Sequence, residues 1–181
     1  MLQKRLVLSV FVCSSLLGAW LLAWCYYSFF QYRTEIEQLL NELPLAEKDL
    51  PHDVKEIFVK GRLLENDYRW HDRLLYKCRG IQGMKKLEIK SHEITWHMLI
   101  PLTLNEQEQI SLYAHLMPFE DGEGLNYGAN HYFSKSVNEL TIDEILTLVV
   151  IARSPSYYLP DERKAEIKEA VERWKINIAL P

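Results

Sequence analysis

The sequence has little glycine, proline or cysteine and no strong excess of charge of one sign. Of its 181 residues, 7 are glycine, 7 are proline and 3 are cysteine. This composition excludes a collagen-like chain, a low-complexity linker and a small scaffold held by disulfides. The formal net charge of -4 excludes a strongly basic nucleic-acid-binding protein. With 48% hydrophobic residues, we expect one domain with an apolar core, plus an appendage.

The appendage is predicted at the N-terminus, where the 25 residues from Leu6 to Phe30 carry no charge. At 1.5 Å per residue this helix would span roughly 37 Å, more than the ~30 Å hydrocarbon core of a bilayer. Lys4 and Arg5 precede the run, and aromatic residues gather toward its far end, as they do at a membrane interface. We expect an uncleaved single-pass anchor. The alternative is a cleaved signal peptide, whose apolar region would be only ~7–15 residues long.

The three cysteines are not placed to form a disulfide within the folded part. Cys13 and Cys25 lie in the apolar run, which leaves Cys78 alone outside it. We therefore predict that Cys78 is a half-buried thiol, with an intermolecular bridge as the alternative.

Beyond the anchor, the apolar periodicity is helical almost throughout. Capping patterns at Asn105 with Glu108 and at Thr141 with Glu144 mark two helix starts. Further helices are predicted around 36–43, 54–61, 125–133 and from Asp161, the last burying Ala165, Val171 and Trp174. The segment 93–102 fits either a helix or an extended strand. We predict an anchor over 1–30, a tether over 31–50 and a compact, mainly α-helical unit over 51–181.

No phosphate-binding loop or nucleophilic serine motif is present. His92 and His97 lie five residues apart, one more than the i, i+4 spacing of zinc proteases, so they point in different directions on a helix. What remains is carboxylate chemistry, because Glu65 and Glu88 each lie among apolar and basic residues. Glycosyl transfer uses such a pair for proton transfer and leaving-group departure. Alternatively, the two are solvated helix-surface carboxylates paired with Arg69 and Lys85.

The stretch from Phe119 to Pro160 changes that balance. It resembles the C-terminal half of the glycosyltransferase family 51 domain of monofunctional peptidoglycan transglycosylases and class A penicillin-binding proteins. The matching elements, in register, are Gly124-Leu125, Gly128-Ala129, Tyr132-Phe133, Lys135, Leu140-Thr141-Ile142, Glu144, Pro155-Ser156, Tyr158 and Pro160. Upstream, residues 108–113 look like the family's Glu-Ile-Leu-x-x-Tyr-Leu-Asn helix, with His115 in place of the Asn.

The resemblance implies a lysozyme-like, mainly α-helical fold and activity on lipid II. It makes Glu65 and Glu88 the catalytic candidates and Lys85 the substrate-binding candidate, because residues 84–88 look like the family's Arg-Lys-x-x-Glu motif. The first catalytic motif matches poorly, since an ungapped alignment from Pro51 puts Arg62 at the position of its Glu. The family's Gly-Gly-Ser-Thr-Ile-Thr-Gln-Gln motif has no counterpart, so part of the substrate cleft is deleted.

We therefore expect a relative of the transglycosylase domain with a degenerate site and a binding or regulatory role in cell-wall biogenesis. It would sit in the bacterial inner (cytoplasmic) membrane with its C-terminal domain outside the cytoplasm. The expected partners are the membrane, lipid II or a glycan strand, or another envelope protein, and no nucleic acid. One alternative is an active, divergent transglycosylase polymerising lipid II, which would call for a divalent cation; otherwise no cofactor or metal is expected. The other is a helical protein-interaction module.

Overall fold

The computed structural model describes residues 2–67, 69–80, 82–158 and 162–178, with the side chains of residues 2–8, 10 and 28 left out. Over these residues the protein is mainly α-helical, as predicted, and consistent with a lysozyme-like domain. The described part contains no β-strand, only an isolated antiparallel bridge between Pro118 and Glu123.

The helices follow one another with short connections. They are α1 (Leu2–Phe30), α2 (Arg33–Glu42), α3 (Leu45–Lys48), α4 (His52–Lys60), α5 (Leu63–Asn66), α6 (Arg69–Arg79), α7 (Lys86–Thr103), α8 (Glu106–His115), α9 (Leu125–Phe133), the 3-10 turn η1 (Val137–Glu139), α10 (Ile142–Arg153) and α11 (Lys164–Ile178).

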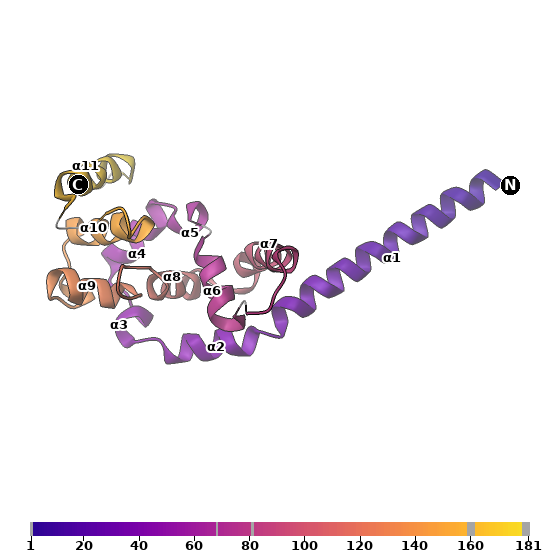
Figure 1. Ribbon diagram of the computed structural model, residues 1–181, viewed down its shortest axis with the longest axis horizontal. Coiled ribbons are helices and arrows are strands. Elements are labelled where there is room, and N and C mark those ends of the chain that lie inside the picture. The colour runs from indigo at the N-terminus through magenta and orange to yellow at the C-terminus, as the bar shows by residue number, and fades with distance from the viewer. Residues whose placement is uncertain (1, 68, 81, 159–161, 179–181) are drawn as a thin grey trace.

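The chain has the shape of a helical body on a long stalk (Figure 1). Helix α1 projects away from the body, and α7 lies where the two meet. Helices α9, α10 and α11 form the opposite end of the body. A site on α9 is therefore held far from the free end of α1.

The core of the body is built around large aromatic side chains. Trp70 of α6, Trp96 of α7 and Tyr113 of α8 are fully buried, and Phe58 of α4 packs edge-on against Tyr113 at 5.2 Å between ring centroids. Burial of such side chains contributes about 1.5–3 kcal/mol each. The core thus joins four helices that are separated in the sequence.

Two predicted helix starts are confirmed. The Asn105 side chain accepts from the backbone N–H of Glu108 at 2.9 Å, and the Glu108 carboxylate accepts from the backbone N–H of Asn105 at 2.8 Å. Thr141 and Glu144 form the same reciprocal pair at the start of α10. These bonds satisfy donors that the first helical turn leaves unpaired.

The structure resolves one ambiguity and corrects one expectation. The segment 93–102 is helical, as part of α7. In α11, Val171 is buried and Trp174 is half-buried, but Ala165 is exposed, so its predicted burial is wrong. The α11 stripe that faces α10 runs instead through Ile167, Ala170 and Val171.

The segment 31–50, predicted as a tether, folds as α2 and α3. Ile36 and Leu43 are buried, and the two helices contact α8 and α9. This packing brings Glu47 of α3 against the C-terminal helices.

For the N-terminal run, no helix within the described part of the chain has the length and apolar character needed to span a membrane. Within the predicted anchor Leu6–Phe30, the side chains of residues 6–8, 10 and 28 lie outside the described part of the structure.

Candidate functional site

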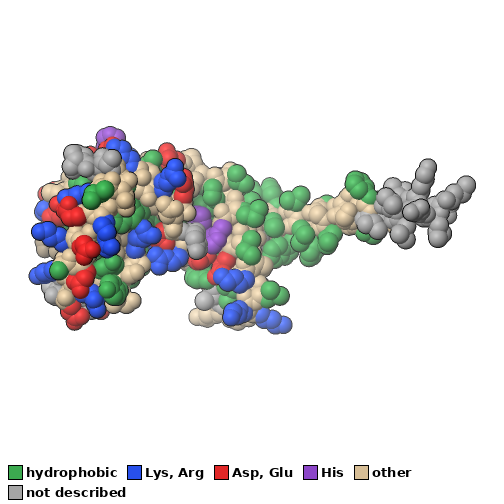
Figure 2. Space-filling view, turned by 90° about the horizontal axis from the view of Figure 1, so that it is seen from above, with side chains coloured by type: hydrophobic (Ala, Val, Ile, Leu, Met, Phe, Trp, Pro, Cys, Tyr) green, Lys and Arg blue, Asp and Glu red, His purple; other side chains and the backbone are tan. Residues whose placement is uncertain are grey.

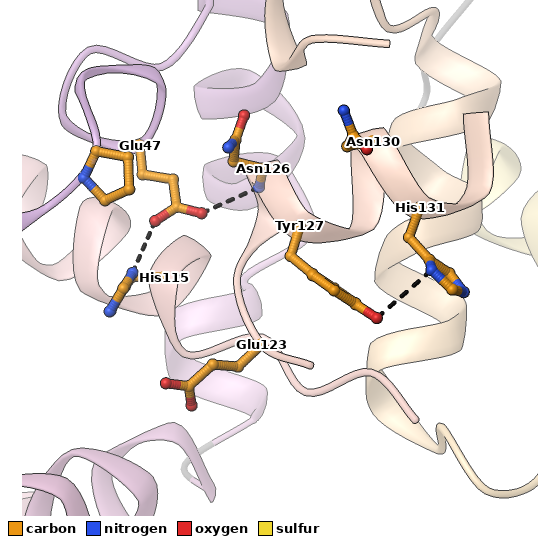
Figure 3. Close-up of a pocket in the computed structure, with 8 residues that line it drawn as sticks. Glu47, His115, Glu123, Asn126, Tyr127, Asn130 and His131 are labelled. Atoms are coloured by element: carbon orange, nitrogen blue, oxygen red, sulfur yellow. Dashed lines mark hydrogen bonds and ion pairs between the residues drawn. The ribbon is translucent and has the colours of Figure 1, made fainter. Parts of the chain in front are cut away.

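A cavity of about 390 Å³ opens between α3, α9 and the end of α8 (Figure 3). Its volume lies within the range of small-molecule sites, ~300–1,000 Å³. Its lining residues are Pro44, Glu47, His115, Glu123, Asn126, Tyr127, Asn130 and His131. We refer to it as the α9 cavity, because half of these residues lie on α9.

Glu47 is a buried carboxylate in this lining, with 2% of its surface exposed. Its Oε2 lies 2.7 Å from Nδ1 of His115, and its Oε1 accepts from the backbone N–H of Asn126 at 3.0 Å. Asn126 belongs to the first turn of α9, where the preceding Gly124 offers no side chain to cap the helix. A carboxylate there supplies the missing acceptor and interacts favourably with the helix dipole. Glu47 therefore caps α9 from another part of the chain.

Gly124 is required by this contact. Its φ is +98°, which side chains rarely adopt, and a Cβ there would lie 2.7 Å from Oε1 of Glu47. Gly124, one of the residues that carry the family resemblance, therefore leaves room for the buried carboxylate of Glu47.

His115 extends the polar network to α6. Its Nε2 lies 3.4 Å from Nζ of Lys77, and Lys77 also forms an ion pair with Glu123. Because an ammonium group can only donate, Nε2 is assigned as an acceptor, which leaves the Nδ1–H to donate to Glu47. The network ties α3, α6, α8 and the α8–α9 connection together.

The α9 wall of the cavity combines amides and aromatic rings. Asn126 and Asn130 are one helical turn apart, as are Tyr127 and His131. The rings of Tyr127 and His131 stack at 5.3 Å with 14° between their planes, and Oη of Tyr127 lies 3.4 Å from Nδ1 of His131. Amides both donate and accept hydrogen bonds, and ring faces pack against apolar C–H groups. This surface can therefore bind a polar, ring-shaped ligand such as a sugar.

The predicted site residues lie elsewhere. Glu65 of α5 is exposed and lies 3.9 Å from Arg62, and Glu88 of α7 is exposed and lies 3.3 Å from Arg79. Lys85 is an exposed residue immediately before α7. The alternative makes both carboxylates solvated surface groups beside Arg69 and Lys85; they are exposed, and their partners are Arg62 and Arg79. Neither carboxylate lines the α9 cavity.

His71, the histidine that follows Glu65 in the degenerate motif, is buried beside Trp70 and His97. Both of its ring nitrogens lack a hydrogen-bond partner among the described residues. Burial, with a further contribution from nearby His97, lowers the pKa of His71 to about 3. A histidine in this environment is a neutral core residue at physiological pH.

The family model described as Transglycosylase matches residues 73–179. The chain belongs to the transglycosylase family, glycosyltransferase family 51. No curated protein matches the sequence. Within the chain, the match includes Lys85, Glu88 and the whole of α8 to α11, whereas Glu47 and Glu65 precede it.

An active transglycosylase would call for a divalent cation, and such an ion needs a set of ligand side chains. No group of three or more His, Cys, Asp or Glu side chains among the described residues is arranged to hold a metal ion. His92 contacts Arg79, whereas His97 lies 2.9 Å from Asp72, so the two histidines serve different partners.

Sequence reasoning missed Glu47 and the α9 wall. Glu47 and Asn126 are 79 positions apart, so no local spacing could connect them. One signal was available: His115 stands where the family has Asn, and its ring is what reaches Glu47. The Cys78 prediction is confirmed in part, because Cys78 is a free, half-buried thiol whose pKa burial raises to about 12.

Proposed function

We propose that this transglycosylase-family protein is anchored in the bacterial cytoplasmic membrane and binds a glycan strand or its lipid-linked precursor without polymerising it. Its role in cell-wall biogenesis would then be regulatory.

The observation that carries this proposal is the environment of the two candidate carboxylates. The side chains of Glu65 and Glu88 are 73% and 46% exposed, and each is next to an arginine. A general base is usually withdrawn from bulk water and held by its neighbours against the attacking group. Solvated carboxylates paired with guanidinium groups have neither property.

The α9 cavity supports the binding half of the proposal. Its lining offers the amides of Asn126 and Asn130 and the stacked rings of Tyr127 and His131. These four residues lie on α9, whose start is capped by the Glu47 carboxylate. Hydrogen bonds to hydroxyls and packing against a sugar ring are the interactions that such a surface provides.

Helix α1 supports the membrane location. Its described side chains include exposed Phe11, Leu16, Leu17, Trp20 and Leu22, and it projects from the body (Figure 1). Lys4 and Arg5 at its start favour a cytoplasmic N-terminus by the positive-inside rule. The body would then lie outside the cytoplasm, where peptidoglycan is assembled.

The test uses full-length protein in detergent with fluorescent lipid II and with purified glycan strands. We expect no polymer, with or without added divalent cation, and measurable binding. Asn130→Ala and His131→Ala should weaken binding several-fold, since each removes a contact group from the cavity. Asn138→Ala, an exposed asparagine of η1, is the matched control and should bind as the unmodified protein does.

Polymer formation would overturn the proposal in favour of an active, divergent transglycosylase. Glu65→Gln and Glu88→Gln would then identify the base, because loss of general-base catalysis costs ~10²–10⁴ in rate. Absence of both binding and turnover would favour the protein-interaction module.

A further inference from the structure

Helix α7 carries an unusual exposed apolar stripe. Leu87, Ile94, Met98 and Leu102 are between 60 and 84% exposed. Their spacings of seven, four and four residues place them on one face of the helix. The opposite face contains the buried Trp96 and Ile100. The helix therefore carries apolar side chains on both faces, and among the described residues the stripe is the face left exposed.

The buried face of α7 packs against the end of α1. Trp96 meets Phe29 at 5.4 Å between ring centroids, and His92 meets Trp24 at the same distance. Thr95 Oγ lies 3.8 Å from Sγ of Cys25. These contacts place α7 beside the last two turns of the apolar run that ends at Phe30.

The order of these contacts shows where the exposed stripe points. Trp96, almost opposite the stripe, contacts Phe29 near the end of α1. Thr95 lies beside Leu102 on the helix surface, seven residues away, and contacts Cys25 earlier in α1. His92 lies between Trp96 and Thr95 around the helix and contacts Trp24. Both side chains on the stripe side of Trp96 therefore contact earlier residues of α1 than Trp96 does. The stripe turns toward the side on which α1 continues away from the body.

The two helices also cross steeply. In Figure 1, α1 lies across the picture whereas α7 is seen nearly end-on. A helix that crosses a membrane anchor in this way runs along the membrane surface. Figure 2 shows hydrophobic side chains gathered where the body meets α1 and continuing along α1, with basic side chains on a projection beside this junction.

The charges at the start of α7 suit a lipid headgroup layer. Lys85 and Lys86 are exposed just before and at the first residue of the helix, and Glu88 in the same turn lies 3.3 Å from Arg79. Anionic headgroups attract such basic residues, and interfacial helices combine an inserted apolar face with basic residues at its edge.

We propose that α7 is an interfacial helix whose stripe of Leu87, Ile94, Met98 and Leu102 rests in the outer leaflet of the membrane that holds α1. The proposal rests on the membrane anchoring proposed above. It adds a second contact, which fixes the tilt of the body and the height of the α9 cavity above the bilayer.

The test compares two introduced cysteines in the full chain, Met98→Cys on the stripe and Ile176→Cys on α11. Ile176 is also an exposed apolar residue, at the far end of the body, and is the matched control. The protein is reconstituted into nanodiscs of phosphatidylethanolamine and phosphatidylglycerol, which leave both membrane faces accessible. Each variant is then reacted with a bulky charged maleimide, and the unmodified chain, with Cys13, Cys25 and Cys78, supplies the background.

We expect Met98→Cys to react at least about tenfold more slowly than Ile176→Cys in nanodiscs, because the acyl boundary excludes a charged reagent. In sodium dodecyl sulfate the two should react alike, which checks the reagent. Equal rates in nanodiscs that carry the protein would overturn the α7 contact and leave the anchor intact. Failure of the chain to co-elute with nanodiscs would overturn the anchor and the α7 contact together.

Discussion

Glu47 and His115 lie 68 residues apart in the chain, yet Oε2 of Glu47 is 2.7 Å from Nδ1 of His115. The same carboxylate accepts the backbone N–H of Asn126 at 3.0 Å. One buried side chain of α3 thus orients a histidine of α8 and caps α9. The position of the α9 cavity depends on both contacts.

The first prediction concerns this carboxylate. Glu47→Ala should lower the free energy of unfolding by about 1–3 kcal/mol, because it leaves a buried donor of α9 without an acceptor. Glu47→Gln should cost less, since an amide oxygen can still accept from Asn126. Urea unfolding of the full chain in detergent, followed by circular dichroism, measures both. Equal losses for the two substitutions would show that capping of α9 is not what Glu47 contributes.

The second prediction tests the close approach of α9 to its neighbours. A Cβ at Gly128 would lie 2.5 Å from the Phe119 ring and 3.1 Å from Cδ2 of Leu148. Gly128→Leu should overpack this contact and cost ~1–3 kcal/mol. Thermal unfolding provides the measurement, and Gly18→Leu is the control, because nothing lies within 4 Å of that position on α1. A melting temperature unaffected by Gly128→Leu would contradict the packing.

Gly128 also shows what the sequence could predict. A glycine on the apolar stripe 125–133 indicates the close approach of a neighbouring segment, and the side chains of Phe119 and Leu148 make that approach. The capping boxes at Asn105 and Thr141 were equally predictable, because their bonds close within three residues. Periodicity and capping are local, so they fix helices well.

The site could not be predicted in the same way. Glu47 follows Pro44 in a stretch that reads as a tether, and its partners are far along the chain. The exposure of Leu87 and Leu102 on α7 was equally hidden, because an apolar residue at helical spacing looks the same whether a neighbour covers it or not. Only tertiary packing distinguishes these cases.

The third prediction follows from His71. Burial and neighbouring His97 lower its pKa from 6.5 to about 3, while Asp67 opposes the shift. Between these two values the unfolded chain binds a proton that the folded chain does not. The free energy of unfolding should therefore fall as pH drops below 6.5, by up to about 1.4 kcal/mol per pH unit. Above pH 6.5 the protonation of His71 should no longer make it depend on pH.

Urea unfolding at pH 7.5 and pH 5.5 measures this slope, in a range where ordinary carboxylates remain ionised. His71→Leu should reduce the slope whatever its effect on stability at pH 7.5. His52→Leu, at an exposed histidine of α4, should leave the slope unchanged. If His71→Leu keeps the full slope, another group is responsible for it.

The last prediction concerns the anchor. Leu16 lies near the middle of the run from Leu6 to Phe30 and is 66% exposed on α1. An arginine at the centre of a membrane-spanning helix costs about 2.5–3.5 kcal/mol on translocon scales. Leu16→Arg should therefore reduce the fraction of protein that resists carbonate extraction from membranes. Leu16→Phe keeps the run apolar and should insert as the unmodified chain does, and Ile176→Arg adds the same charge to the exposed surface of α11 without affecting insertion. If the Leu16→Arg and Leu16→Phe variants were retained equally, α1 would hold the protein at the membrane surface rather than across the bilayer, because a charge is tolerated only where water can reach it.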